Sequence, residues 1–290
     1  FRYGGIDFFA LDSNTINDPL PLPETKEGKA FRSLLQKRQD KLEQKKEEIR
    51  ETSGKLNPNN PSDAELIDDL QSKLSQIEEM IVDIDKQLHT PRIAVTDTEQ
   101  LEWLKQRLIQ SWNTSEVRGR ILYFHHPPYV TEATKWDQAQ TLAIRSRIRN
   151  VLEAVAQEVK SLTQGRSIVD LVFNGHAHCM EHIETLDTGN ADSNINWIVC
   201  GGSGHSLRRQ RPEGADLQEY FPTRNEKSKL VARSHLFVGR NGSGSNKRRP
   251  YSGLRIDVKE GSPPKFVVKP LVAERYQREW HQPEMESFII

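Results

Sequence analysis

The segment from Thr25 to His89 most constrains the fold, because its Lys, Glu, Gln and Leu residues follow a helical period and leave no strand pattern. Its one interruption, residues 54–61, contains glycine, asparagines and prolines and predicts a turn. After the turn, apolar residues at alternating spacings of three and four form a heptad seam: Ile67, Leu70, Leu74, Ile77, Ile81, Ile84 and Leu88. Before it the seam is sparser: Phe31, Leu35, Leu42 and Ile49. The sequence therefore predicts two helices that form an antiparallel hairpin.

The role of this helical hairpin has two interpretations. Charges of both signs at helical spacing are typical of a solvated exterior, which favours an inserted hairpin of no specific role. The alternative is a docking arm for a protein partner or a second subunit. Neither interpretation makes the hairpin catalytic. It divides the chain into one domain formed by residues 1–23 and 91–290, and a hairpin insertion at 24–90.

The remainder of the chain alternates apolar strands with amphipathic helices, which predicts an α/β fold. We expect a helix that begins at a capping box formed by Thr96 and Glu99, and a long helix from Asp137 to Lys160. Strands are expected at 6–11, 120–124, 168–173, 181–186, 196–200, 254–258 and 266–271.

Overall charge and composition exclude several classes of partner. The 290 residues include 41 basic and 41 acidic side chains, so the net charge gives no attraction to nucleic acid. No segment has the roughly 20 consecutive apolar residues of a membrane helix. Two cysteines cannot build a disulfide framework, which favours a soluble protein of a reducing compartment such as the cytoplasm. Because Phe1 opens what reads as a strand already in progress, a missing signal peptide says nothing about secretion.

Residues 206–250 carry a local basic excess, with eleven Arg or Lys against four acids. The tract 239–246 is rich in glycine and serine and predicts a flexible loop. One interpretation is a solvated loop insertion. The other is a basic rim that attracts phosphorylated substrates, which local charge achieves without a net charge.

Two expected strands end in clustered histidines. In His176-Ala177-His178 the imidazoles are one residue apart, so in an extended backbone both project to the same side. In His125-His126-Pro127 the residue before proline is extended, so neighbouring side chains face opposite ways and only one reaches a shared site. We assign His125 as the ligand.

A single histidine at a strand end is more often a hydrogen-bonded structural residue than a ligand. Two strands that both end in histidine pairs beside proline or glycine instead indicate a metal site. The predicted ligands are His125, His176 and His178, with His126 and Asn174 as supporting residues or alternative ligands. Gly175 permits a close approach at the strand end.

These segments resemble a known family. LYFHHPPY, FNGHAHCMEH and WIVCGGSG are similar to the last two metal-binding motifs, and the strand after them, of calcineurin-like metallophosphoesterases, especially purple acid phosphatase-like members. TDTEQLEWLKQRL resembles the helix upstream, and GIDFFALDSN the strand that follows an earlier motif. The resemblance covers residues 1–17 and 94–205.

The resemblance implies a four-layer α/β/β/α sandwich with two metal ions, of Mn, Fe or Zn, at the strand ends. His125 and His176 then bind one ion and His178 the other, and the reaction is hydrolysis of a phosphoric ester. The substrate is a phosphorylated molecule whose identity does not follow from the fold.

Three motifs of the family are absent from this sequence: Asp-x-His, Gly-Asp-x-x-Asp, and Gly-Asn-His followed by Asp or Glu. Two neighbouring dications need a bridging anion, which neutral imidazoles do not supply. We expect either the carboxy-terminal fragment of a metallophosphoesterase, or a non-catalytic relative that acts as an interaction protein through its helical hairpin.

Overall fold

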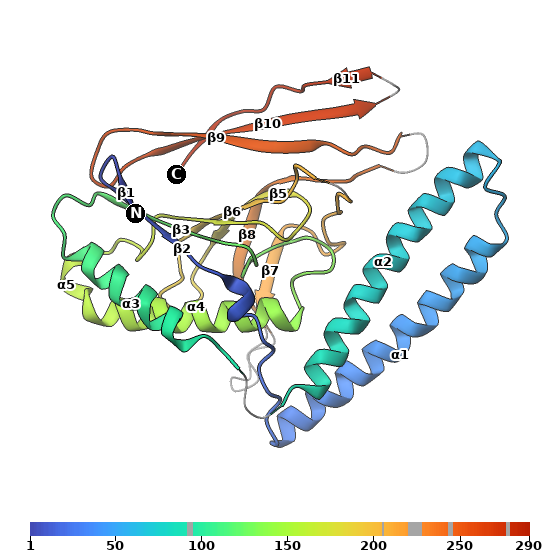
Figure 1. Ribbon diagram of the computed structural model, residues 1–290, viewed down its shortest axis with the longest axis horizontal. Helices are drawn as coiled ribbons and strands as arrows, with labels where there is room; N and C mark the ends of the chain where they lie inside the picture. The colour runs from blue at the N-terminus through green and yellow to red at the C-terminus, as the bar shows by residue number, and fades with distance from the viewer. Residues whose placement is uncertain (92–94, 205, 220–227, 243–245, 277–278) are drawn as a thin grey trace.

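The computed structural model describes residues 1–290 except 92–94, 205, 220–227, 243–245 and 277–278. It is a mixed α/β structure with one large mixed sheet and a smaller second sheet, which confirms the predicted class (Figure 1). The helices are α1 (Lys26–Gly54), α2 (Pro61–His89), α3 (Thr98–Trp112), α4 (Ala139–Glu158) and α5 (Lys160–Thr163). The strands are β1 (Arg2–Tyr3), β2 (Ile6–Ala10), β3 (Gly119–Phe124), β4 (Leu171–Asn174), β5 (Met180–Thr185), β6 (Asn196–Cys200), β7 (Asp216–Glu219), β8 (Lys229–Val238), β9 (Tyr251–Val258), β10 (Phe266–Tyr276), β11 (Glu279–His281) and β12 (Phe288–Ile289).

The large sheet has the strand order β1-β2-β3-β4-β6-β5-β8-β7. Strands β2, β3, β4 and β6 are parallel to one another, and β5, β8 and β7 continue the sheet in antiparallel pairs. The register pairs Phe124 with Asn174, the last residues of β3 and β4. The segments that follow these two strands therefore leave the sheet at the same edge, where open α/β sheets commonly bind ligands.

Two hydrophobic cores cover the two faces of the large sheet. Helices α3 and α4 pack on one face, through Leu104, Leu108, Ile144, Ile148 and Leu152 against Leu122, Val172 and Trp197. The small sheet, β9 to β12, packs on the other face, with Phe266 and Val268 against Ile6, Ile121, Leu171 and Ile198. The described residues thus form three layers, and they place no helix on the outer face of the small sheet (Figure 1).

Helices α1 and α2 project together from this body and lie side by side (Figure 1); we call them the arm. The Thr25 side chain caps α1, and Asn60 caps α2 with Pro61 as its first residue. The helices contact each other through a common apolar cluster of Leu42, Ile49, Leu56, Leu70, Leu74, Ile77, Met80 and Ile81. Burial of this seam holds the two amphipathic helices together.

Two local expectations differ from the structure. The side chain that caps α3 is Asp97, which accepts from the Gln100 backbone N–H at 2.9 Å, and not Thr96. Residues 206–250, expected as a loop insertion, contribute β7 and β8 to the large sheet. The glycine- and serine-rich tract 239–246 lies partly outside the described residues.

In the part of the chain that the structure describes, no helix has both the length and the apolar character required to cross a bilayer. Both cysteines are free thiols, and Cys179 is buried.

Candidate functional site: a cluster of histidines

Three histidines meet where β3 and β4 end. Ring nitrogens of His125, His126 and His176 all lie within 4.8 Å of one another. The Gly175 backbone N–H donates to the His125 carbonyl at 3.0 Å and joins the two segments. We call this group the histidine cluster. It reaches the surface through His125, whereas His126 is buried and His176 is half-buried.

His126 is oriented by two residues from the turn after β2. Ser13 Oγ lies 2.9 Å from its Nδ1 and accepts from its backbone N–H at 3.1 Å. The Asn17 amide nitrogen lies 3.2 Å from Nε2. With the ring proton on Nδ1 and donated to Ser13, the Nε2 lone pair accepts from the Asn17 amide, which must release it before that lone pair can bind a metal ion. Sequence reasoning missed Ser13 and Asn17, because their distance along the chain conceals the contact.

The prediction that His125 and His126 face opposite ways is wrong. Strand β3 ends at Phe124, and the chain bends at both histidines, so the side-chain alternation of a strand no longer applies. Their ring centroids lie 5.0 Å apart, and both rings contact that of His176.

His176 has a left-handed backbone, with φ of 60°. This conformation is uncommon outside glycine and is concentrated at functional sites. The Gln140 side-chain nitrogen of α4 lies 2.8 Å from its Nε2, so the amide N–H donates to the imidazole lone pair. Sequence reasoning also missed Gln140, which offers no motif of its own.

His178 lies outside the histidine cluster among the described residues. The left-handed turn at His176 removes the extended backbone that the same-side argument assumed. The His178 Nδ1 instead lies 3.1 Å from the Ser206 carbonyl, to which it donates when protonated.

Asn174 and Gly175 support the site as neighbours. The Asn174 amide donates to the Phe124 carbonyl at 3.0 Å, and its buried Oδ1 has no hydrogen-bond partner among the described residues. A Cβ added at Gly175 would lie 3.2 Å from His125 Nδ1, so glycine permits the close approach of that ring.

Burial and a nearby cation favour the neutral form of all three clustered imidazoles. Desolvation is the largest cause of each lowered pKa, and it brings the pKa of His126 to about 4. The Lys135 charge lowers the pKa of all three rings further. Neutral imidazoles have lone pairs available for a metal ion near pH 7.

The arm reaches the cluster through a chain of hydrogen bonds. Glu79 of α2 accepts from the Gln138 amide at 3.0 Å, and Gln138 accepts from Gln140 at 2.9 Å. Gln140 in turn contacts His176. Glu79 also forms an ion pair with Lys135. The arm therefore belongs to the surroundings of the site.

Four basic residues of the 206–250 segment are paired with acids of α2. Arg240 and Lys247 contact Asp69, and Lys247 and Arg249 contact Asp68. Further along α2, Arg208 lies 3.6 Å from Glu79. Arg224 and Lys227 of the expected rim lie outside the described residues.

The residues present fit one metal ion. Three imidazoles with an open position form a donor set that suits Zn, Mn or Fe. Nitrogens that share one ion lie about 3 Å apart at metal–nitrogen distances of about 2.0–2.1 Å, so the three rings, whose nitrogens now lie within 4.8 Å of one another, would have to close around a bound ion. The described part of the chain adds no carboxylate to this group, so a bridging anion for a second ion is not among its ligands.

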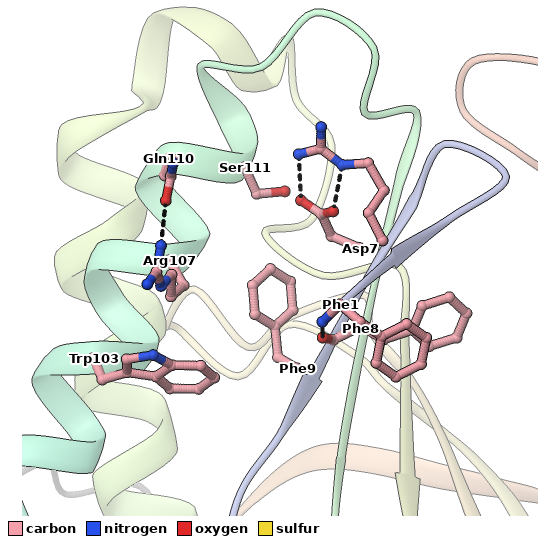
Figure 2. A pocket seen from close by; sticks show the side chains of 9 residues that line it. Phe1, Asp7, Phe8, Phe9, Trp103, Arg107, Gln110 and Ser111 are labelled. Atoms are coloured by element: carbon pink, nitrogen blue, oxygen red, sulfur yellow. Dashed lines mark hydrogen bonds and ion pairs between the residues drawn. The ribbon is translucent and has the colours of Figure 1, made fainter.

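A cavity of about 400 Å³ lies elsewhere, between β2 and α3 (Figure 2). Its lining includes the stacked rings of Phe1 and Phe8, with Phe9 and Trp103. No histidine of the cluster lines it.

Comparison with family models and with curated proteins gives no match. Among solved structures, the chain is similar to GAP50, the anchor in the inner membrane complex of Plasmodium, with 15% identity and a TM-score of 0.27 over 65% of this chain and 43% of that one. It is also similar to PhoD, with 16% identity and a TM-score of 0.35 over 67% of this chain and 33% of that one. The chain therefore spans less than half of either protein, and scores this low assign it no function.

Proposed function

We propose that this chain belongs to a metal-dependent phosphoric ester hydrolase, and that His125, His126 and His176 hold a metal ion. The observation that carries the proposal is the convergence of three imidazole nitrogens within 4.8 Å at the ends of adjacent parallel strands. The resemblance of these two segments to metallophosphoesterase motifs supports it. The two-metal site and the four-layer sandwich remain parts of the same proposal.

A bound ion would supply a Lewis acid that polarises a phosphoryl oxygen. The protein's own residues prepare this position. Ser13 orients the buried His126 ring, and exposed His125 leaves the site open to a substrate from solvent. Gln140 must release the Nε2 of His176 before that lone pair can bind an ion, if Nε2 is the ligand atom.

Metal binding tests the assignment without an assay of catalysis. We expect His126→Ala and His176→Ala to weaken binding of Zn²⁺ or Mn²⁺ by more than the roughly 10–100-fold typical of residues that merely orient a ligand. His178→Ala should retain binding. Isothermal titration of each variant measures this. Equal loss in His178→Ala would contradict the assignment of His126 in its place.

Hydrolysis of an aryl phosphate with Mn or Fe supplied tests the activity in the intact protein. His176→Ala should abolish the turnover. Full activity in that variant would disprove the hydrolase proposal.

A further inference from the structure

Two buried cations lie between the arm and the histidine cluster. Lys135 is 5% exposed and Arg208 is 8% exposed. The backbone N–H of Arg208 donates to the His178 carbonyl at 2.9 Å, which places its residue beside the second histidine pair. Lys135 follows His125 and His126 along the chain, and it lies close enough for its charge to act on all three rings of the histidine cluster.

A single carboxylate of the arm bridges these cations. One oxygen of Glu79 contacts Lys135, and the other lies 3.6 Å from Arg208 Nη2, beyond normal hydrogen-bond length. The other terminal nitrogen of Arg208, Nη1, is buried and has no hydrogen-bond partner among the described residues. The guanidinium therefore retains donors that Glu79 does not satisfy.

A second acid lies nearby without replacing Glu79. Glu132 is fully buried and accepts from the Thr134 hydroxyl at 2.9 Å. Burial raises the pKa of Glu132, which favours its neutral form, whereas Lys135 helps to lower that of Glu79. Glu79 is thus the principal anion between the two cations.

A phosphoryl group matches these donors better than a carboxylate. It presents three acceptor oxygens and up to two negative charges, and arginine binds it through two parallel N–H donors. Lys135 and Arg208 are also connected to the histidine cluster, since Glu79 leads through Gln138 and Gln140 to His176.

We propose that Lys135 and Arg208 form a binding position for the phosphoryl group of a substrate, and that the Glu79 carboxylate of the arm occupies this position in the structure. This inference deepens the proposed hydrolase function and rests on it for its biological meaning. The anion site itself is measurable without metal and without turnover.

The test is a calorimetric titration of metal-free protein with inorganic phosphate at constant ionic strength. Glu79→Gln keeps the shape of the side chain and removes its charge. We expect it to bind phosphate about tenfold more tightly than the wild type, because a competing charge-assisted contact is lost. Asp68→Asn is the matched control, since it breaks ion pairs of the same helix with Lys247 and Arg249 only. It should leave phosphate affinity unchanged.

Adding Lys135→Gln or Arg208→Lys to the Glu79→Gln variant should remove the gain. Arg208→Lys keeps the positive charge and is therefore the variant less prone to misfold. Thermal unfolding without phosphate shows whether each variant is folded. Equal phosphate affinity in the wild type and Glu79→Gln would overturn the inference. An equal gain in Asp68→Asn would also overturn it, because general loosening of the arm would then be the cause.

The outcome is separable from that of the proposed function. The gain should persist in a protein that also carries His176→Ala, even if no hydrolysis is ever detected. Conversely, a hydrolase whose Glu79→Gln variant gains no phosphate affinity would retain the proposed function and exclude this position.

Discussion

Glu181 of β5 is a fully buried carboxyl in the body of the protein. It accepts hydrogen bonds from the backbone N–H of Thr131 at 3.0 Å and from the Thr131 hydroxyl. Burial raises its pKa from 4.5 to about 7. The native state therefore holds a proton over a range in which the unfolded chain releases it. The associated stability is complete below pH 4.5 and is lost as the pH rises through 7.

We predict that Glu181→Gln, which cannot ionise, removes the decrease in the free energy of unfolding that Glu181 causes as the pH rises. Its free energy of unfolding relative to the wild type should rise between about pH 5 and about pH 8, as measured by urea denaturation at both pH values. Glu260→Gln, in an exposed turn, should follow the wild-type profile. A Glu181→Gln profile parallel to that of the wild type would show that the buried carboxyl stays ionised.

The histidines show what sequence can and cannot determine at the residue scale. His125 and His176 could be placed together because apolar strands ended beside them. The sequence offered His126 only as a supporting residue or alternative ligand, because its place in the cluster, and the absence of His178 from it among the described residues, depend on the bend after Phe124 and the positive φ at His176. Strand periodicity applies only as far as the strand continues.

At the scale of the elements, helix α4 receives its N-terminal cap from the arm. Gln138 precedes α4 without a side-chain cap, and Asp83 of α2 accepts from the Ala139 backbone N–H at 2.9 and 3.0 Å. The first turn of α4 carries Gln140, which contacts His176. The arm thus stabilises the helix end that faces the cluster.

We predict that Asp83→Ala destabilises the first turn of α4 by about 1 kcal/mol, the usual effect of a lost cap. Hydrogen exchange of the Ala139 and Gln140 amides should accelerate. Asp85→Ala, on the exposed side of the same helix, should not change these amides. Unchanged exchange in Asp83→Ala would mean that packing alone holds the turn.

Sequence periodicity located most elements but misjudged one region. Strand β6 has the predicted bounds, and the bounds of β3, β5 and helix α4 differ from the predicted ones by one or two residues. Strands β7 and β8 were not predicted, because the expectation of a loop at 206–250 rested on the many basic residues of that segment. The run from Leu230 to Val238 nevertheless contains the buried Val231, Ala232 and Val238, and this apolar pattern could have predicted a strand.

At the scale of the whole molecule, the arm and the body have complementary charge. Residues 24–90 carry fifteen acidic and twelve basic side chains in a chain that is neutral overall. The acids Asp68, Asp69 and Glu79 contact cations of the body. Sequence alone predicted a solvated exterior for the helices, because one-dimensional patterning does not show which charges meet across a tertiary contact.

We predict that replacing residues 24–90 by a short Gly/Ser linker lowers the thermal unfolding midpoint of the body. The buried cations Lys135 and Arg208 would lose their counter-charge, and α4 would lose its cap. Asp68→Asn should change the midpoint little, because its ion pairs are exposed. An unchanged midpoint in the linker variant would make the arm an independent appendage, as the solvated interpretation holds.

The contacts along α2 fall into two sets, one at Asp68 and Asp69 and one at Glu79 and Asp83. Ten residues separate Asp69 from Glu79, which is about 15 Å along a helix. Contacts at two separate points fix the angle of α2 relative to the body, whereas contacts at one point alone would let the helix rotate about that point. If the contacts of Asp68 and Asp69 were lost, the arm would rotate about the contacts of Glu79 and Asp83, next to the histidine cluster. A force applied at residues 54–61 would then act as a torque on Glu79.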